Sequence, residues 1–253
     1  MDNLSKRPPR SHYGDDADQF VEISHPAGEP VGTVISIHGG YWRSPYGLDL
    51  HDPIVEHCVG LGWVVVNIEY RRMSPDDQTQ DSTGEVGWEE LSSDVKRALA
   101  VATDEAKPTV VIGHSAGGQL ALWAGAQDDL SVDAVVALAP VADLFLADAL
   151  ELSEHATKAL FGTTGAERPD LYASASPVNL VPLGIPQLVI HGRADENVPI
   201  EMAVEYVETA QLCGDAVEFS DPAGVDHFNV IDPKHAVWRT VDKFLDHLGL
   251  NQD

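Results

Sequence analysis

The sequence predicts an α/β protein with a mostly parallel central sheet that helices cover on both faces. Short, near-continuous apolar segments recur along the chain at the length of strands, and segments with helical spacing lie between or after them. Strands buried on both faces lack the alternation of half-exposed strands, so this pattern favours a parallel sheet between two helix layers. With 253 residues, of which 43% are hydrophobic, the chain is long enough to bury a substantial core.

Each element is expected from its own pattern. The expected strands are rich in Val, Ile, Leu and Ala, and they cover residues 31–37, 63–68, 109–112, 134–139, 187–191 and 216–220. The expected helices cover residues 53–60, 88–102, 119–126, 200–213 and 234–248. In the second of these, Leu91, Val95 and Leu99 recur at intervals of four and form one face of a helix.

Two segments depart from this regular alternation. Residues 1–20 are polar and contain Pro8-Pro9, so we expect a loosely packed N-terminal arm, followed by a single domain over residues 21–253. Residues 141–185 are rich in Gly, Ser and Pro and separate two expected strands. They form either a small cap over a site at the carboxyl edge of the sheet or an ordinary long connection with short helices.

The formal net charge of -26 is the most unusual bulk property of the chain. Binding to nucleic acid or to anionic membranes needs clustered Lys and Arg, so we expect neither as a partner. We expect a solvated acidic surface that aids solubility or tolerates salt, and steering of cationic substrates is the alternative. A homodimer is left open.

Cysteine usage and the N-terminus predict a cytoplasmic location. The two cysteines, Cys58 and Cys213, lie far apart and form no C-x-x-C motif, which suits a reducing compartment. Residues 1–10 contain no apolar core of a secretory signal, and no apolar run approaches the length of a membrane span. The segment 51–57 lacks the His-Glu spacing of zinc hydrolases, so we expect neither a metal nor another cofactor.

The segment Gly113-His114-Ser115-Ala116-Gly117 carries the strongest chemical signal. It follows an apolar strand and precedes a helical segment, which is the context of a nucleophile elbow. In such a turn the serine hydroxyl is exposed above a parallel sheet, and the flanking glycines allow close approach and unusual dihedral angles. We therefore expect Ser115 to be a catalytic nucleophile.

A serine hydroxyl becomes a good nucleophile only beside a base that a third group orients. His227 lies in a loop after the expected strand 216–220, and we expect it to be the general base. Asp195 follows the expected strand 187–191, where a carboxylate reaches the carboxyl edge of the sheet, and it is the expected orienting acid. The alternatives lie beside the same turns and loops: Asp226 and Glu196 for the acid, and His191 and His114 for the base.

Hydrolysis through a tetrahedral intermediate also needs N–H donors aimed at the developing oxyanion. One expected donor is the backbone N–H of Ala116, directly after the nucleophile. The others are the N–H groups of Gly40 and Tyr41, in a glycine-containing loop that His38 is expected to brace. The candidates for the walls of a substrate pocket are aromatic: Tyr41, Trp42 and Phe228. Burial in the core is the alternative for Trp42.

Taken together, the segments 38–42, 113–117 and 226–228 resemble those of the kynurenine formamidase (arylformamidase) branch of the α/β-hydrolase superfamily. That branch is close to the hormone-sensitive-lipase-like esterases, and the resemblance in fold extends over residues 30–250. The resemblance implies a serine hydrolase that cleaves N-formylkynurenine to kynurenine and formate. Lipase-like esterases usually carry a third glycine where this chain has Tyr41, which favours the formamidase branch.

We therefore expect a small-molecule acyl substrate, an ester or an aryl formamide, that is hydrolysed through a covalent acyl-enzyme. A general carboxylesterase is one alternative. A small aminopeptidase similar to prolyl-oligopeptidase catalytic domains is another, although such enzymes usually add a propeller that this sequence does not contain. A non-enzymatic binding protein of the same fold is less favoured, because such proteins often lose a triad member or an oxyanion donor.

Overall fold

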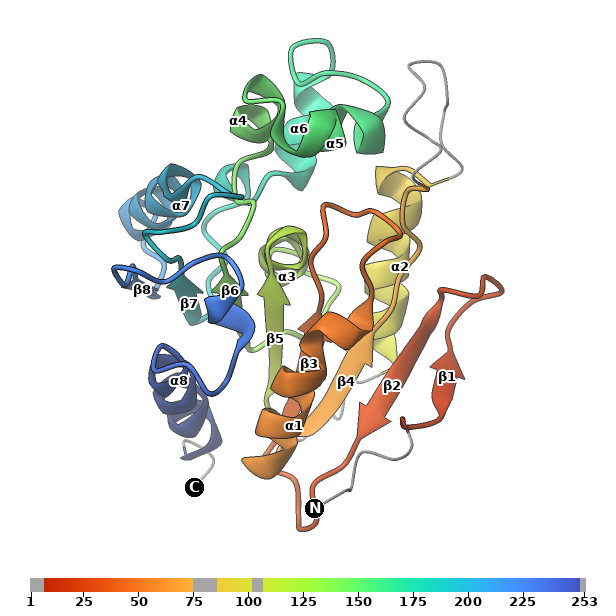
Figure 1. Cartoon of the computed structure of the whole chain (residues 1–253), viewed down its shortest axis with the longest axis vertical. Helices are drawn as coiled ribbons and strands as arrows, with labels where there is room; N and C mark the ends of the chain where they lie inside the picture. Colours follow the sequence, from red (N-terminus) through yellow and green to blue (C-terminus); the bar gives the residue numbers. More distant parts are fainter. Residues whose placement is uncertain (1–6, 75–85, 102–106, 251–253) are drawn as a thin grey trace.

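The computed structural model describes residues 7–74, 86–101 and 107–250 of the chain. Its strands form one sheet in the order β1-β2-β4-β3-β5-β6-β7-β8 (Figure 1). Neighbouring strands from β4 to β8 in this order run parallel, whereas β1 and β2 are antiparallel additions at one edge. The mostly parallel sheet predicted from the sequence is confirmed. The strands are β1 (Arg10–His12), β2 (Phe20–Ser24), β3 (Thr33–Ile37), β4 (Val64–Ile68), β5 (Thr109–His114), β6 (Ala134–Leu138), β7 (Gln187–Ile190) and β8 (Val217–Ser220).

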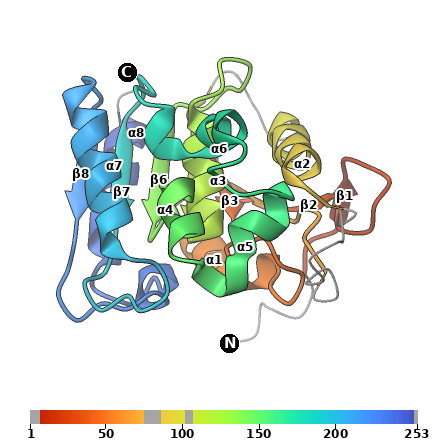
Figure 2. The same ribbon diagram turned by 90° about the horizontal axis from the view of Figure 1, so that it is seen from above.

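Helices cover both faces of the sheet. One buried cluster places α1 and α8 on one face, and a second, larger cluster places α2, α3 and α7 on the other (Figures 1 and 2). The α-helices are α1 (Asp52–Gly60), α2 (Trp88–Ala100), α3 (Ala116–Gly125), α4 (Leu144–Ala149), α5 (Leu152–Phe161), α6 (Pro169–Ala175), α7 (Ile200–Leu212) and α8 (Trp238–Leu250). Short 3-10 helices occur at η1 (Leu48–His51), η3 (Pro177–Asn179) and η4 (Asn229–Ile231).

Successive side chains of the central strands point alternately into the two helix layers, as a pleated strand requires. Val34 of β3 and Val110 of β5 belong to the cluster beneath α1 and α8. The next residues along the chain, Ile35 and Val111, belong to the cluster beneath α2, α3 and α7. Complete burial of each such side chain contributes about 1.5–3 kcal/mol. The two layers therefore hold the strand ends, and the loops that leave them, in a fixed register.

Residues 10–20 do not form the loosely packed arm that the sequence predicts. Residues 10–12 form β1, which pairs antiparallel with β2 in register His12↔Phe20. Between these strands, the Tyr13 hydroxyl donates a 2.6 Å hydrogen bond to the carbonyl of Glu69. The expectation of a loose arm up to residue 20 is therefore wrong for residues 10–20. Polar composition misled it, because an exposed edge strand needs few apolar residues.

The segment 141–185 forms α4, α5, α6 and η3 beyond the carboxyl ends of the parallel strands. Figure 1 shows these helices above the sheet, and the view from above in Figure 2 shows α4 and α5 in front of α3. Arg43, in the loop after β3, donates hydrogen bonds to the carbonyls of Ser153 (2.7 Å) and Glu154 (3.2 Å) in α5. Ser153 and Glu154 are left-handed, with φ of 48° and 55°. The start of α5 is thus irregular and is tied to a loop at the carboxyl edge of the sheet.

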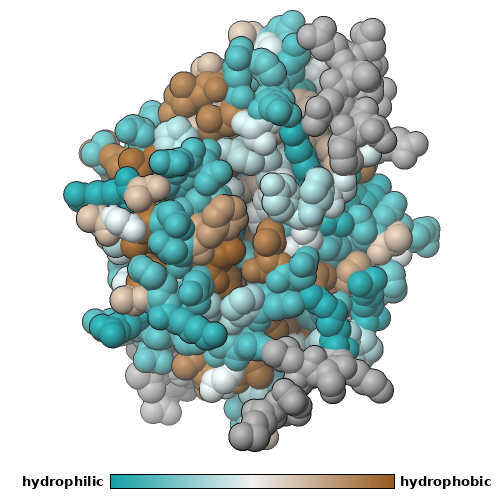
Figure 3. Space-filling model, viewed as in Figure 1, coloured by the Kyte–Doolittle hydropathy of each residue, from teal (hydrophilic) through white to brown (hydrophobic). Residues whose placement is uncertain are grey.

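The remaining elements differ from the sequence expectations mainly at their ends. The last helix starts at Trp238 rather than near residue 234, because residues 232–237 form turns. The expected end of the helix 88–102 falls outside the described residues. Across 7–74, 86–101 and 107–250, no helix is both long and apolar enough to cross a membrane. Figure 3 shows mainly hydrophilic residues on one face, with hydrophobic residues gathered at its centre and toward the upper left of the view.

Candidate active site

Ser115 occupies a sharp turn between β5 and α3. Its backbone has φ 56° and ψ -118°, a conformation that non-glycine residues rarely adopt. The two elbow glycines are required by close backbone contacts. A Cβ on Gly117 would overlap the carbonyl oxygens of Ile37 and His38, and a Cβ on Gly113 would overlap the carbonyl of Gly117. The elbow geometry that the sequence predicts is therefore present.

Backbone hydrogen bonds to the neighbouring strand hold the elbow in place. The Ser115 N–H donates to the Leu138 carbonyl at 2.8 Å, and the Val141 N–H donates to the Ser115 carbonyl at 3.2 Å. These hydrogen bonds engage both the N–H and the carbonyl of Ser115. Such contacts allow a strained backbone conformation to persist. The N-terminus of α3 begins directly after Ser115, so its positive dipole end lies at the serine.

Asp195 lies in the loop after β7, and its side chain is fully shielded from solvent. One carboxylate oxygen, Oδ1, accepts the N–H groups of Asn197 (2.8 Å) and Val198 (2.9 Å). The other oxygen, Oδ2, lies 2.6 Å from His227 Nδ1 and 3.3 Å from His191 Nε2. Burial alone raises the pKa of Asp195, but the hydrogen bonds from His191 and His227 outweigh it, and the pKa is lowered well below its usual range. Asp195 is therefore an ionised carboxylate that two histidines share.

His227 lies next to the elbow through its contact with His114. The His114 Nε2 is 2.9 Å from the His227 carbonyl, and the two rings are 4.6 Å apart. Burial, followed by repulsion from His227, lowers the pKa of His114 well below its usual value, so this imidazole is neutral. The Nδ1 of His227 is engaged with Asp195, which leaves Nε2 as its free nitrogen. Ser115 Oγ has no hydrogen bond to any described residue, so the serine–histidine contact is not formed in this structure.

The structure distinguishes among the alternative acids and bases. Asp226 accepts the N–H groups of Phe228 (2.9 Å) and Asn229 (2.7 Å) within its own loop, and its side chain has no contact with His227 of hydrogen-bond length. Glu196 lies on the exposed side of the acid loop. His114 and His191 both use Nε2 for backbone carbonyls. Among the described residues, only Asp195 pairs with His227.

The loop 38–42 after β3 lies directly against the serine. A Cβ on Gly39 would lie 2.9 Å from the Ser115 Cβ. Gly40, Tyr41 and Trp42 have successive positive φ angles of 113°, 48° and 58°. The N–H groups of Gly40 and Tyr41 donate to no acceptor among the residues that the structure describes. These two expected donors are thus unpaired and next to the elbow.

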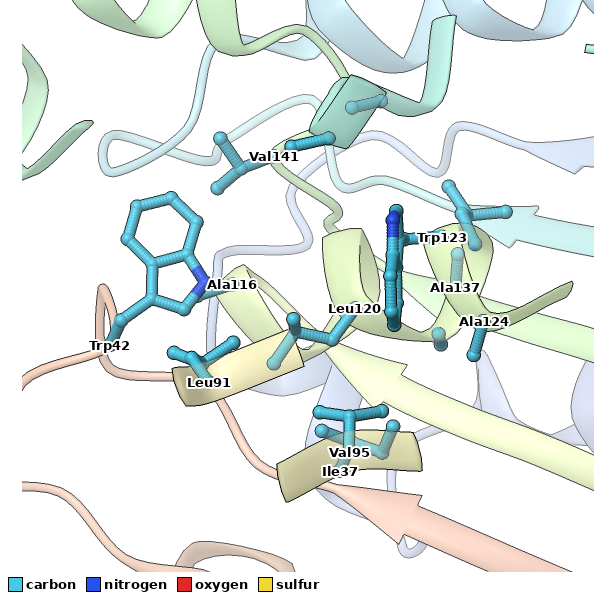
Figure 4. Close-up of a cluster of buried hydrophobic side chains, with 14 of the residues drawn as sticks. Ile37, Trp42, Leu91, Val95, Ala116, Leu120, Trp123, Ala124, Ala137 and Val141 are labelled. Atoms are coloured by element: carbon cyan, nitrogen blue, oxygen red, sulfur yellow. The ribbon is translucent and has the colours of Figure 1, made fainter. Parts of the chain in front are cut away.

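The three aromatic candidates for a pocket take different positions. Tyr41 is partly buried, and its hydroxyl donates a 2.9 Å hydrogen bond to the Asn197 carbonyl in the acid loop. Phe228 is 53% exposed and its ring lies 5.3 Å from that of His227. Trp42 is 0% exposed, so the expectation that it lines an open pocket is wrong, and the alternative of core burial holds. Its indole fills space between α2 and α3, beside Leu91 (Figure 4).

A buried polar pair, His38 and Glu69, holds the start of the loop 38–42. His38 Nε2 lies 2.9 Å from Glu69 Oε1, and the Tyr70 ring stacks on His38 with centroids 4.5 Å apart. Burial raises the pKa of Glu69, but the hydrogen bond and charge of His38 exceed this effect, so the pKa is lowered overall. The Leu48 N–H also donates to Glu69 at 3.1 Å. His38 therefore makes the contacts expected of a residue that braces this loop.

Two residues near the site were missed or undervalued from the sequence. The sequence suggests His191 only as an alternative base, whereas in the structure it contacts Asp195, and Gln119 bridges α3 to Trp42. The partners of Gln119 are distant in the chain, and the contact of His191 with Asp195, four residues away, depends on how the loop after β7 folds. In the described ranges, no group of three His, Cys, Asp or Glu side chains is arranged to hold a metal ion.

The sheet, the elbow and the two loops that bring Asp195 and His227 together define the class of this protein, which has the α/β-hydrolase fold. The chain belongs to the BD-FAE family, whose match covers residues 21–209. That range includes the elbow and the acid loop and ends before His227.

Two curated relatives from Mycobacterium tuberculosis are named as ester hydrolases. Esterase LipC is 26% identical over 249 residues, which cover 87% of this chain and 59% of LipC. Probable carboxylic ester hydrolase LipM is 29% identical over 201 residues, which cover 69% of this chain and 44% of LipM. The chain thus matches about half the length of these relatives.

Solved structures show the same fold. A truncated carbohydrate esterase from gut microbiota has a TM-score of 0.74 at 21% identity, covering 95% of this chain and 99% of that chain. The propionate-bound esterase Est2 of Thermogutta terrifontis has a TM-score of 0.72 at 23% identity, covering 96% and 94%. At these identities the likeness is one of fold. The finer resemblance to kynurenine formamidases stays a prediction.

Proposed function

We propose that this protein is a serine carboxylester hydrolase in which Ser115, His227 and Asp195 form the catalytic triad. The observation that carries the proposal is the 2.6 Å contact between His227 Nδ1 and Asp195 Oδ2, beside a serine with an elbow backbone. An ionised, buried carboxylate fixes the tautomer of a histidine and stabilises its protonated form. The match to a family with ester-hydrolase relatives supports the same chemistry.

The reaction proceeds in two halves. His227 Nε2 removes the proton of the Ser115 hydroxyl as Oγ attacks the substrate carbonyl, and the resulting imidazolium then protonates the leaving alcohol. This half forms a Ser115 ester and releases the alcohol. A water molecule next gives its proton to His227 and attacks the acyl-enzyme, and the carboxylic acid is released as Ser115 regains its proton. Asp195 stays ionised throughout.

The oxyanion of each tetrahedral intermediate is bound by backbone N–H groups of Ala116, Gly40 and Tyr41. Their unpaired N–H groups and the N-terminal dipole of α3 supply fixed positive charge, so no reorganisation is needed as charge develops. The contact of Gly39 with Ser115 supports this role, because it brings the loop within reach of the attacked carbonyl.

The serine itself points to a small acyl group. Ser115 is 2% exposed and His227 is 5% exposed, so both reacting residues are largely shielded from solvent. Short acyl esters suit such a shielded site, and so does the formyl group of an aryl formamide. Phe228 provides an exposed aromatic surface beside His227 for the leaving group. N-formylkynurenine is therefore the second substrate candidate, favoured by the loop sequence around Tyr41.

The proposal is tested by steady-state kinetics on the whole chain with p-nitrophenyl acetate, butyrate and octanoate and with N-formylkynurenine. We expect turnover of the acetate to exceed that of the octanoate, and Ser115→Ala to lower kcat by about 10⁴-fold or more while the protein stays folded. Ser92→Ala, a matched change on the exposed face of α2, should leave kcat unchanged.

Unchanged hydrolysis by Ser115→Ala would refute the proposed nucleophile. A kcat/KM for N-formylkynurenine that exceeds every ester value by about a hundredfold assigns the formamidase role. A value below the acetate value removes that role and leaves the esterase proposal standing.

A further inference from the structure

The loop that carries the two oxyanion donors is held in an unfavourable backbone conformation. Tyr41 and Trp42 are bulky residues with φ of 48° and 58°, and they follow Gly40 with φ of 113°. Side chains of this size are rarely left-handed, and such residues persist only where the surroundings hold them. Some contact must therefore keep this loop in place, and the direction of the Gly40 and Tyr41 N–H groups depends on it.

Gln119 makes such a contact. Its side chain is fully buried, Oε1 accepts the Trp42 indole N–H at 3.2 Å, and Nε2 donates to the Ala175 carbonyl at 2.9 Å. Gln119 lies one turn after Ser115 in α3, where its N–H donates to the Ser115 carbonyl at 3.1 Å. Figure 4 shows the Trp42 ring with its nitrogen directed toward Ala116 at the start of α3.

Other contacts hold the main chain of this loop: His38 Nδ1 lies 2.7 Å from the Gly39 carbonyl, and the Arg43 N–H donates to the Gly40 carbonyl at 3.0 Å. The Met73 N–H donates to the Trp42 carbonyl at 2.8 Å, and the Tyr41 hydroxyl donates to the Asn197 carbonyl at 2.9 Å. These bonds hold the main chain and the outer ring. Among residues 7–74, 86–101 and 107–250, only Gln119 hydrogen-bonds the Trp42 side chain.

We infer that Gln119 is a positioning residue that acts through Trp42. By holding the Trp42 side chain, it helps to fix the orientation of the oxyanion N–H groups of Gly40 and Tyr41, and this inference rests on the proposed function. Both polar ends of the amide are used, so no apolar or shorter side chain replaces it without leaving a buried partner unpaired. Because Ala175 ends α6, the same amide also links α6 to the oxyanion loop.

The test is Gln119→Leu, which keeps the approximate volume and removes both hydrogen bonds. Loss of a single oxyanion donor lowers kcat by about 10²–10³-fold, so displaced donors should lower kcat for p-nitrophenyl acetate by about tenfold or more. We expect KM to stay within about twofold, because the tetrahedral oxyanion forms only after substrate binding. Gln127→Leu is the matched control, since the Gln127 side chain, among the described residues, hydrogen-bonds only the Trp123 carbonyl near the far end of α3. Its kcat should equal that of the unmodified protein.

A double-mutant cycle with Trp42→Phe separates positioning from general loosening. Trp42→Phe removes the indole donor and keeps an aromatic ring, and we expect it to lower kcat with KM little changed. If Gln119 acts through Trp42, the double variant should lose little more than Gln119→Leu alone. Additive losses, or a kcat of Gln119→Leu within twofold of the unmodified protein, would overturn the inference.

Two further measurements distinguish loss of positioning from unfolding and from failure of the proposed function. Circular dichroism at the assay temperature establishes that each variant is folded; if Gln119→Leu is unfolded, an unchanged kcat in Trp42→Phe is enough to overturn the inference. Retained turnover in Ser115→Ala would instead reject the proposed function. Loss of turnover in Ser115→Ala together with normal kinetics in Gln119→Leu rejects the positioning role alone.

Discussion

Asp195 is the residue on which the proposed triad depends, and its surroundings explain its state. Two backbone N–H groups occupy Oδ1, while His227 and His191 approach Oδ2. The hydrogen bonds to the carboxylate favour its charged form and exceed the effect of burial. His191 thus supports the ionised acid at the same oxygen that His227 contacts.

His191 is predicted to position Asp195. Its Nε2 lies 3.3 Å from Asp195 Oδ2 and 3.0 Å from the Val198 carbonyl, and both partners are acceptors, so Nε2 carries the proton. His191→Leu removes this donor, and we expect kcat to fall by about tenfold to a hundredfold through misplacement of the acid. His191→Gln places an amide donor near Nε2 and should restore part of the loss.

His155→Leu, at an exposed position in α5, is the control for that series and should have normal kinetics. Equal kcat values in His191→Leu and the unmodified protein would show that the backbone N–H groups of Asn197 and Val198 suffice to hold Asp195.

At the scale of elements, the strand–turn–helix unit from β5 to α3 has no room for side chains at its glycines. Gly117→Ala places a methyl group against the backbone carbonyls of Ile37 and His38, and backbone cannot move aside as a side chain can. We expect the free energy of unfolding to fall by about 1–3 kcal/mol, the usual cost of overpacking. Urea denaturation followed by circular dichroism measures it.

Gly60→Ala is the matched change, because a Cβ at Gly60 has no atom within 4 Å and the residue ends helix α1. Alanine restricts the unfolded chain, so this variant should be more stable by about 0.4–1 kcal/mol. If Gly117→Ala is as stable as Gly60→Ala, the elbow does not need glycine for packing.

The sequence predicts the buried elements well and the edge elements poorly. The central strands, such as β5, are continuous apolar runs, so their composition alone identifies them. Strand β1 is fully exposed and consists of Arg, Ser and His, and only its pairing with β2 makes it a strand. Local composition does not predict such pairing between strands.

The candidate site follows the same rule. The elbow was predictable because Gly113 and Gly117 are needed locally by the turn itself. The burial of Trp42 depends on residues far apart in the chain, and the contact of His191 with Asp195 depends on the fold of the loop between them, so no motif indicates either. The order of the loops in the sequence predicts that His227 lies beside the elbow. It does not predict whether the Ser115 hydroxyl is hydrogen-bonded.

At the scale of the whole molecule, buried neutral histidines make stability depend on pH. Burial, and to a lesser degree the nearby His38, lowers the pKa of His51 to about 3 from a usual value of 6.5. Between these values the unfolded chain binds a proton at this position and the folded protein does not. The free energy of unfolding therefore falls as pH decreases below about 6.5, by about 1.4 kcal/mol per pH unit for this group.

His51→Asn removes this dependence and keeps a polar atom near the Ser36 hydroxyl, which lies 2.7 Å from His51 Nδ1. The variant should be less stable at pH 7, but its urea-derived stability should fall less steeply between pH 6.5 and 5. The acidic surface gains protons equally in both proteins, so its effect cancels in the comparison. Parallel pH profiles would contradict a neutral buried His51, and His155→Asn should match the unmodified profile.

Covalent trapping shows whether Ser115 is the activated nucleophile. The whole chain is treated with a fluorophosphonate, and the intact mass and the peptide that contains Ser115 are measured by mass spectrometry. We predict one phosphonyl group per chain on Ser115, loss of esterase activity in proportion to labelling, and no labelling of Ser115→Ala. Labelling of another residue with parallel loss of activity, or full activity after Ser115 is modified, would contradict the account.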